Sequence, residues 1–324
     1  MSNIQVQYMG LQLANPLVAA SSGITGTPEK IAACEDAGMG GVVVKSLFQE
    51  EIEHKIHQMD SSSHPEGHDY IAALQTGFDL EQYCGLIRAA KSRVHIPVIG
   101  SLNAFRHEWW VERLPQIAAA GADAIELNLA LLPQNFADDE AKIRRWYADT
   151  VREATSSVNI PIAVKVGPYF SSLPLLIDEL HKAGAKAVVL FNRFYQFDID
   201  IDTFKLRSGA PFSTSRDAGL PMRWISLLYG KTKMEMAASS GIHTADDLIK
   251  LILAGAQVGQ LCSTLYQNGL GQVATILKGL DEYMKRHHFT ELQQFRGKVS
   301  QNRSEVPRDF ERIQYIKSLT SSVD

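Results

Sequence analysis

Residues 183–192 read AGAKAVVLFN, and this segment combines three signals that recur along the chain. Its Ala-Gly-Ala turn ends a helical stretch, because glycine readily adopts the left-handed conformation that terminates helices. The apolar run that follows has no polar alternation, which is typical of a strand in a parallel sheet covered by helices. The run closes on Asn192, the first residue expected to reach a pocket at the carboxyl end of the strand.

The same unit recurs about eight times in the 324 residues of the chain. Comparable turns surround Gly38, Gly121 and Gly255. Two other runs follow Pro97 and Pro161, since proline keeps the preceding residue extended. Strand, loop, helix and short turn repeated in this way predict one (β/α)8 TIM barrel, an α/β fold that typically needs ~250 residues. The strand-like runs are residues 16–20, 42–44, 98–100, 125–127, 162–164, 188–191, 236–238 and 260–262.

An open, doubly wound α/β sheet is the alternative architecture. Such a sheet usually carries a glycine-rich nucleotide loop after its first strand. Here the first run is followed by Ser22-Gly23-Ile24-Thr25-Gly26, which lacks the spacing of a dinucleotide-binding loop. The barrel is therefore the favoured fold.

Three segments lie outside the repeat. Residues 4–17, with Met9-Gly10 between two alternating stretches, predict a β-hairpin that closes the bottom of the barrel. We expect a barrel domain over residues 1–297 and a C-terminal tail, helical and docked on the barrel, over residues 298–324. Residues 49–70 are too long for an ordinary connection and predict a lid over the mouth. The histidines of this segment lack the regular spacing of zinc ligands, so no metal is expected; they are His54, His57, His64 and His68.

The composition favours an enzyme of a reducing compartment over a nucleic-acid-binding or membrane protein. The chain carries 32 Lys and Arg against 36 Asp and Glu, a net charge of −4, and so lacks the basic surface that nucleic acids require. No apolar run approaches the ~18 residues of a membrane span, and residues 1–10 lack the features of a signal peptide. Cys34, Cys84 and Cys262 have neither metal-ligand nor disulfide spacing. We therefore expect a cytoplasmic location.

Two lysines occupy the ends of strand-like runs. Lys45 closes the run 42–44 and Lys165 the run 162–164, whereas barrel interiors are filled by layers of branched apolar side chains. Both cations are therefore expected to face an anionic or electron-rich ligand. Asn128 and Asn192 add amide groups that can pair with the carbonyl and ring nitrogen of a planar heterocycle. For each residue alone, a polar side chain that merely caps its strand is an equally good interpretation.

Small residues follow the last two runs. Ser240-Gly241 and Ser263-Thr264 offer backbone N–H groups for a phosphate, and barrels frequently bind a phosphate at this position. Together with the lysines and asparagines, these segments predict a phosphate pocket beside a ring-binding pocket.

Eight segments share their order and spacing with a known family. They are Asn15-Pro16-Leu17, Ala20-Ser21-Ser22-Gly23, Val44-Lys45-Ser46, Glu126-Leu127-Asn128-Leu129, Val164-Lys165, Phe191-Asn192, Ser240-Gly241-Ile242 and Gln260-Leu261-Cys262-Ser263-Thr264-Leu265. Together they resemble the dihydroorotate dehydrogenases over residues 4–297. The last segment is also similar to the flavin domain of dihydropyrimidine dehydrogenase.

The resemblance implies an FMN-dependent oxidoreductase that acts on the CH–CH group of a dihydropyrimidine-like substrate in pyrimidine metabolism. It implies that Lys165 lies near N1 of the flavin, where a cation stabilises the negative charge of the reduced ring. A homodimer is expected, because soluble members of the family are commonly dimers. The implied cofactor residues are Ala20, Ser21, Lys45, Ser46, Asn103, Asn128, Lys165, Asn192, Ser240, Gly241, Ser263 and Thr264. The candidate catalytic residues are Lys45, Lys165, Asn128 and Tyr195, and the candidate substrate residues are Lys45, Asn128, Asn192 and Arg193.

The sequence departs from the family on the substrate side of the pocket. Family members carry a catalytic Cys or Ser in the loop after the fourth strand, whereas residues 128–135 read NLALLPQN and place Leu131 at the position of this base. The Asn-Ser-Met-Gly segment of the family is replaced by residues 70–79, which retain only Gly77-Phe78-Asp79. We therefore expect the chain to oxidise dihydroorotate poorly or not at all.

The residues after the sixth run also differ from the small polar residue of the family. Arg193 would bind a substrate carboxylate bidentately or pair with Asp198 or Asp200. Tyr195 or Tyr169 would serve as a proton donor or simply pack. Two other functions stay open, namely a flavin-dependent reductase of another ene or cyclic amide, and a flavin- or nucleotide-binding protein without catalysis.

Overall fold

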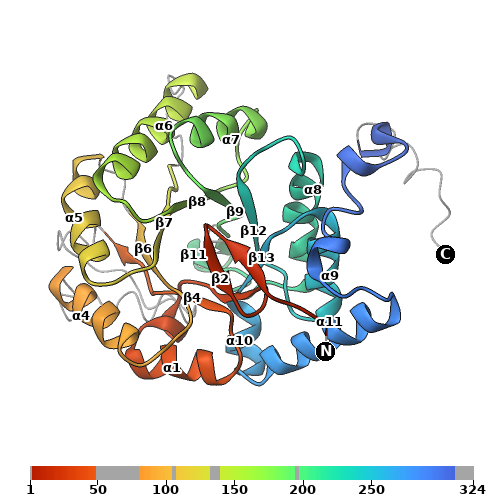
Figure 1. Cartoon of the computed structure of the whole chain (residues 1–324). Helices are drawn as coiled ribbons and strands as arrows, with labels where there is room; N and C mark the ends of the chain where they lie inside the picture. Colours follow the sequence, from red (N-terminus) through yellow and green to blue (C-terminus); the bar gives the residue numbers. More distant parts are fainter. Residues whose placement is uncertain (1, 49–79, 104–106, 132–138, 194–196, 311–324) are drawn as a thin grey trace.

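The computed structural model describes residues 2–48, 80–103, 107–131, 139–193 and 197–310. Its centre is a closed barrel of eight parallel strands, which confirms the predicted fold (Figure 1). The strands are β3 (Leu17–Ala19), β4 (Gly41–Val43), β6 (Val98–Asn103), β7 (Ala124–Asn128), β8 (Ile162–Val166), β9 (Ala187–Leu190), β12 (Glu235–Ser239) and β13 (Val258–Leu261). The pairing of β4 with β6 closes the barrel, and the short β5 (Leu47–Phe48) extends beside β6.

The strands are apolar because they are buried on both sides. Every residue of β4, β8 and β9 is buried, so no position along them calls for the polar alternation of a half-exposed strand. Lys165 in β8 is the exception to this apolar composition. A charged residue in such a strand therefore marks a position with a special environment.

Helices alternate with the strands and form an outer ring around the barrel (Figure 1). Four helices end next to a glycine, namely Gly38, Gly121, Gly184 or Gly255. The φ angles of these glycines are +93°, +99°, +107° and +129°, which residues with a side chain rarely adopt. The Ala-Gly turns of the sequence therefore end helices as predicted. The helices are α1 (Pro28–Asp36), α4 (Leu80–Lys91), α5 (His107–Ala119), α6 (Glu140–Ser157), α7 (Leu173–Lys182), α8 (Gly219–Leu228), α9 (Ala245–Ala254), α10 (Ser263–Asn268) and α11 (Gln272–Arg286).

The predicted amino-terminal hairpin is present and closes the bottom of the barrel (Figure 1). It consists of β1 (Val6–Tyr8) and β2 (Leu11–Leu13). The side chain of Gln257 donates to the carbonyl of Gln7 at 2.6 Å, and the N–H of Met9 donates to Glu235 at the start of β12. Just before the hairpin, the N–H of Asn3 donates to the carbonyl of Thr290 at 2.7 Å. The first residues of the chain are therefore tied to the segment that follows α11.

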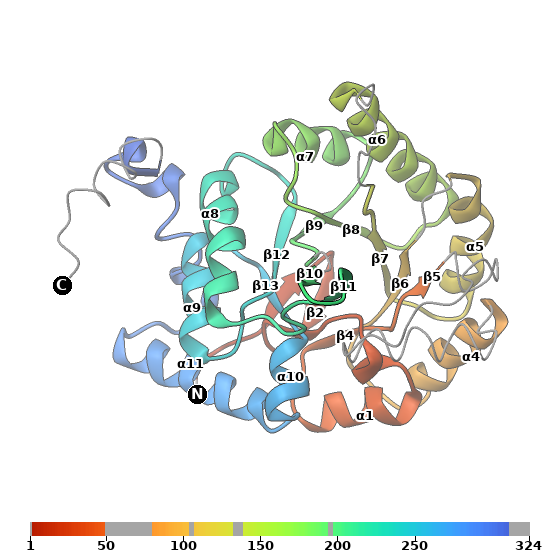
Figure 2. The same cartoon turned by 180° about the vertical axis from the view of Figure 1, so that it is seen from behind.

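A second hairpin, for which the sequence carries no recognised signal, lies over the opposite end of the barrel (Figure 2). Its strands are β10 (Phe197–Asp200) and β11 (Lys205–Ser208). The hairpin exposes a group of large apolar side chains, which we call the hairpin patch. Its residues are Phe197, Ile199, Ile201, Phe204 and Leu206.

After α11 the described chain continues as short 3-10 turns, namely η3 (Leu292–Gln294), η4 (Gln301–Arg303) and η5 (Pro307–Phe310). The N–H groups of Gly297 and Val299 donate to carbonyls of α9 residues Ile252 and Leu253, both at 2.9 Å. Across the described ranges, no helix has the length and apolar character needed to cross a bilayer. The predicted lid at residues 49–70, with its four histidines, lies outside the described residues.

Candidate active site

A cavity opens at the carboxyl ends of the barrel strands. The cavity has a volume of about 160 Å³. Its lining comes from the ends of β3, β4, β7, β8, β9, β12 and β13 and from the loop before α8. The predicted residues that line it are Ala20, Ser21, Lys45, Ser46, Asn128, Lys165, Asn192, Arg193, Ser240, Gly241 and Ser263. The structure therefore brings most of the candidate residues into one pocket.

Two candidate residues within the described ranges do not line this cavity. Asn103 is the last residue of β6. Thr264 is buried in α10, and its Oγ1 accepts a hydrogen bond from Asn268 Nδ2 of the same helix at 3.1 Å. Because Thr264 lies in α10, its side chain bonds within that helix and does not reach the cavity. Tyr195 lies outside the described residues.

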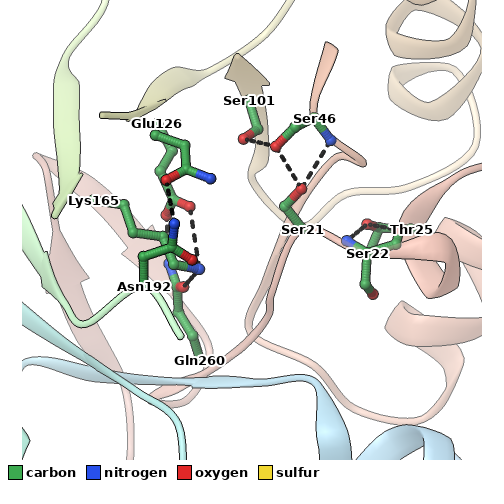
Figure 3. Close-up of polar contacts among 10 residues, drawn as sticks. Ser21, Ser22, Thr25, Ser46, Ser101, Glu126, Lys165, Asn192 and Gln260 are labelled. Atoms are coloured by element: carbon green, nitrogen blue, oxygen red, sulfur yellow. Dashed lines mark hydrogen bonds and ion pairs between the residues drawn. The ribbon is translucent and has the colours of Figure 1, made fainter. Parts of the chain in front are cut away.

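Three buried polar side chains form the floor of the cavity (Figure 3). Lys165 is 8% exposed, and its Nζ donates to Gln260 Oε1 at 3.3 Å. Gln260 Nε2 in turn donates to Glu126 Oε2 at 2.5 Å. The distance from Lys165 Nζ to Glu126 Oε1 is 3.9 Å. A cation, an amide and a carboxylate are therefore joined in one network at the bottom of the pocket.

An amide pair lies next to this floor. Asn192 Nδ2 donates to Asn128 Oδ1 at 2.9 Å, and the N–H of Asn192 donates to the carbonyl of Val166 at 2.8 Å. Because each amide uses only some of its hydrogen-bonding capacity in this pair, the two side chains retain donors and acceptors for a ligand. The pair is therefore suited to recognise the polar edge of a ring.

The wall formed by β3 and β4 is built from small side chains held by a chain of hydroxyl groups (Figure 3). Ser21 Oγ lies 2.9 Å from Ser46 Oγ and accepts from the Ser46 N–H at 2.8 Å. Ser46 Oγ lies 2.7 Å from Ser101 Oγ. The hydroxyl of Tyr83 donates to the Ser101 carbonyl at 2.9 Å and accepts from the Ser101 N–H at 2.7 Å. This buried network fixes the positions of the small side chains on this wall, and their small size leaves room for a flat molecule beside them.

Another part of the cavity lining is a polar cradle built around Ser213. The N–H of Ser213 donates to Ser263 Oγ at 3.0 Å, and the N–H of Gly241 donates to Ser213 Oγ at 3.3 Å. Ser213 Oγ also lies 3.1 Å from His243 Nε2. Ser240 and Gly241 both have positive φ angles, +80° and +78°, which turn the chain sharply after β12. The cradle therefore gathers hydroxyl and N–H groups beside the ring of His243.

Gly241 is predicted to tolerate no side chain. A Cβ atom there would lie 2.1 Å from the backbone nitrogen of Ala218, in addition to the strain of its positive φ. We expect Gly241→Ala to lower the free energy of unfolding by about 2 kcal/mol or more. Gly219→Ala is the control, because Gly219 has a φ of −61° and no atom within 4 Å of its Cβ position. Urea unfolding curves that shift equally for the two variants would contradict this prediction.

The loop after β7 is fixed by Tyr147. The N–H of Leu131 donates to Tyr147 OH at 3.1 Å, and this hydroxyl donates to the carbonyl of Leu129 at 3.3 Å. Burial raises the pKa of Tyr147 to about 12, so the hydroxyl remains protonated at neutral pH. The side chain of Leu131 packs against the core and does not line the cavity. Tyr147 is therefore a structural anchor and no proton acceptor.

Arg193 holds the loop on the far side of the pocket. Its guanidinium group donates to the carbonyls of Ala210 at 2.9 Å and Pro211 at 3.3 Å. Asp198, one of the partners considered for Arg193, accepts two hydrogen bonds from Arg207, which lower the pKa of its carboxyl group. Tyr169, the alternative proton donor, is 69% exposed. Arg193 thus lines the cavity and also anchors the loop that contains Pro211, another lining residue.

Several lining residues were not among the candidates. Glu126 had a signal, because it precedes Asn128 by two positions and successive strand residues alternate between faces. Gln260 was likewise visible as a polar residue inside an apolar strand. Phe212 and Ser213 had no signal, because the path of the chain after β11 brings them to the pocket. The remaining additional lining residues are Ser22, Gly23, Phe48, Pro211, Ser239, Ile242, Cys262 and Tyr266.

Comparison with known proteins gives consistent matches along the chain. A family model described as dihydroorotate dehydrogenase matches residues 3–284. The putative dihydroorotate dehydrogenase A (fumarate) of Aeropyrum pernix is 25% identical over 315 residues, which cover 91% of this chain and 96% of the relative. The catalytic subunit of dihydroorotate dehydrogenase B (NAD(+)) of Thermoplasma acidophilum is 27% identical over 313 residues, covering 92% and 99%. That of Methanosarcina mazei is 25% identical over 316 residues, covering 91% and 95%.

Proposed function

The chain belongs to the dihydroorotate dehydrogenase family, and from this premise we propose that it is an FMN-dependent oxidoreductase. Because the chain belongs to this family, it is a dehydrogenase. Its proposed reaction is at the CH–CH group of a dihydropyrimidine-like substrate in pyrimidine metabolism. One observation carries the proposal: a buried lysine, an amide pair and a cradle of small polar residues all line a single cavity.

The chemistry of the cavity residues fits FMN. Lys165 supplies a buried positive charge, and Asn128 and Asn192 supply hydrogen-bond donors and acceptors suited to the pyrimidine edge of the ring. Ala20 and Ser21 would lie against the ring, because their short side chains leave the wall low. The cradle around Ser213 and Gly241 would hold the phosphate, as N–H and hydroxyl groups do in many anion sites.

Each group of residues then has a separate task. When bound, FMN supplies the two-electron acceptor for substrate oxidation. Lys165 favours added negative charge at the floor of the cavity, while the Asn128–Asn192 pair orients the polar edge of the ligands. Lys45, which also lines the cavity, adds a second positive charge on the opposite wall. Within the described part of the loop after β7, Leu131 offers no proton acceptor, so the described residues of this loop do not supply the base.

We expect the purified protein to bind FMN non-covalently. The prediction rests on the two sets of polar groups that line the cavity, because riboflavin has no phosphate and would not use the cradle around Ser213. Visible flavin absorbance and release of free FMN on denaturation would both be observed, and riboflavin should bind at least about tenfold more weakly than FMN, since one charge-assisted contact contributes about 1.4 kcal/mol or more. A colourless protein that takes up no FMN on reconstitution would refute the proposed function.

A second candidate function is the flavin-dependent reduction of another ene or cyclic amide. Leu131 favours it, because reduction adds a proton to carbon and water can supply that proton, whereas oxidation needs a base to remove one and position 131 lacks it. Steady-state assays with dihydropyrimidines and with unsaturated cyclic amides, run in both directions, distinguish the two functions.

We also propose that the chain forms a homodimer and acts in the cytoplasm. Five large apolar side chains of the hairpin patch are more than half exposed, which is costly on an isolated protein. A twofold-symmetric contact would bury this surface, since most soluble oligomers are cyclic dimers. Light scattering at micromolar concentration should give twice the 35.9 kDa of one chain. A mass equal to that of one chain would refute the dimer.

A further inference from the structure

The floor of the cavity holds a buried carboxylate beside its buried lysine. Glu126 is 1% exposed, and its Oε1 atom lies 3.9 Å from Lys165 Nζ. Gln260, which is 2% exposed, connects the two groups through its side-chain amide. All three residues line the cavity. A ligand on this floor would therefore meet a pair of opposite charges, and not an isolated cation.

The hydrogen bonds fix the orientation of Gln260. Lys165 can only donate, so the amide oxygen of Gln260 must face it. The amide nitrogen of Gln260 then faces Glu126 and donates to its Oε2 atom, so this oxygen is an acceptor. A carboxylate satisfies this arrangement. Gln260 thereby bridges the side chains of Glu126 and Lys165.

The charge of Glu126 is weakly screened. Among the described residues, its Oε1 atom has no hydrogen-bond partner, and neither has the buried hydroxyl of Tyr8 in the amino-terminal hairpin. Burial, followed by the negative charges of Glu126 and Glu235, raises the pKa of Tyr8. Charge interactions are much stronger in such surroundings than in water. The field of Glu126 therefore extends along the barrel axis as well as into the cavity.

We propose that Glu126 sets the reduction potential of the flavin in this cavity by offsetting the charge of Lys165. Reduction adds negative charge to the ring, which Lys165 stabilises and Glu126 opposes. The potential is consequently lower than Lys165 alone would make it, and a flavin held at lower potential gives up its electrons more readily. This inference rests on the proposed function, because it requires a flavin on the floor of the cavity.

The experiment measures the potential of the bound flavin in Glu126→Gln by anaerobic titration against redox dyes. Glutamine keeps the shape and the acceptor for Gln260 Nε2 but removes the charge. We expect the equilibrium constant for two-electron reduction to increase at least tenfold, which corresponds to about 30 mV. Glu126→Met, which removes the charge with a different shape, is expected to change the constant in the same direction.

Glu235→Gln is the matched control. It makes the same chemical change on β12 at the other end of the barrel, where Glu235 accepts the Met9 N–H. Its constant is expected to stay within threefold of the unmodified protein. Flavin bound to Glu126→Gln with an unchanged constant would overturn the inference, as would equal changes in Glu126→Gln and Glu235→Gln. An unmodified protein that binds no flavin would instead overturn the proposed function.

Discussion

Dihydroorotate is expected to be oxidised about 10² to 10⁴-fold more slowly by this protein than by a flavin dehydrogenase with an intact base, because general-base catalysis contributes factors of this size. Leucine at position 131 cannot accept a proton, and its side chain packs against the core. Cys34 and Cys84 lie in α1 and α4, and burial raises the pKa of both thiols, that of Cys34 to about 11. Neither thiol can replace the missing base.

Stopped-flow reduction of the bound flavin by dihydroorotate measures this step directly. Leu131→Cys, whose smaller side chain is expected to turn from the core toward the cavity, should increase the rate at least tenfold, whereas Leu131→Ala, which removes the leucine without adding a base, should not. A rate unchanged in Leu131→Cys would assign the loss to the altered segment at residues 70–79. Turnover by the unmodified protein at the ordinary ~1 to 10³ per second would show that another residue acts as the base and would contradict the prediction.

Lys165→Met is expected to lower the free energy of unfolding by about 3 to 5 kcal/mol. The substitution leaves the carboxylate of Glu126 buried without its cation, and breaking a buried ion pair from one side typically costs this much. Lys91→Met is the control, because the Lys91–Asp123 pair at 2.7 Å has side chains that are 30% and 27% exposed. Partly exposed pairs contribute about 1 kcal/mol or less.

The double variant Lys165→Met with Glu126→Gln tests the cause of this loss. Removing both charges relieves the unpaired carboxylate, so the double variant should be more stable in urea at pH 7 than Lys165→Met alone. Such coupling is the signature of a direct interaction between the two sites. Additive effects, or a Lys165→Met variant that is no less stable than Lys91→Met, would show that the charge pair contributes nothing to folding.

The barrel could be predicted from the sequence because its signals are local. Glycines such as Gly184 end helices through their own backbone conformation. Strands such as β9 are apolar throughout because the fold buries both of their faces. The β10–β11 hairpin could not be predicted in this way, since its apolar side chains are exposed and its position over the mouth depends on tertiary contacts.

The candidate site likewise contains residues that a local sequence pattern predicts and residues that only the tertiary structure places. Lys165, Asn128 and Asn192 follow from their places at strand ends, where barrel geometry brings them together. Ser213 reaches the cavity through a loop whose path no local pattern describes. Thr264 was a candidate because it follows a strand, yet α10 begins one residue earlier and turns its side chain away. Local pattern therefore locates the rim but does not orient each side chain on it.

The tie between the first residues and the segment after α11 has a consequence for synthesis on the ribosome. Ser2 donates to Asp281 at 3.4 Å, Asn3 donates to Thr290, and Gln7 accepts from Gln257. These partners emerge more than two hundred residues later, and contacts of such long sequence separation form late because the intervening loop must close first. The β1–β2 hairpin is made before the barrel but can finish docking only when nearly the whole barrel has been translated. Until then Tyr8 and Leu13, both fully buried in the finished barrel, remain exposed on the nascent chain.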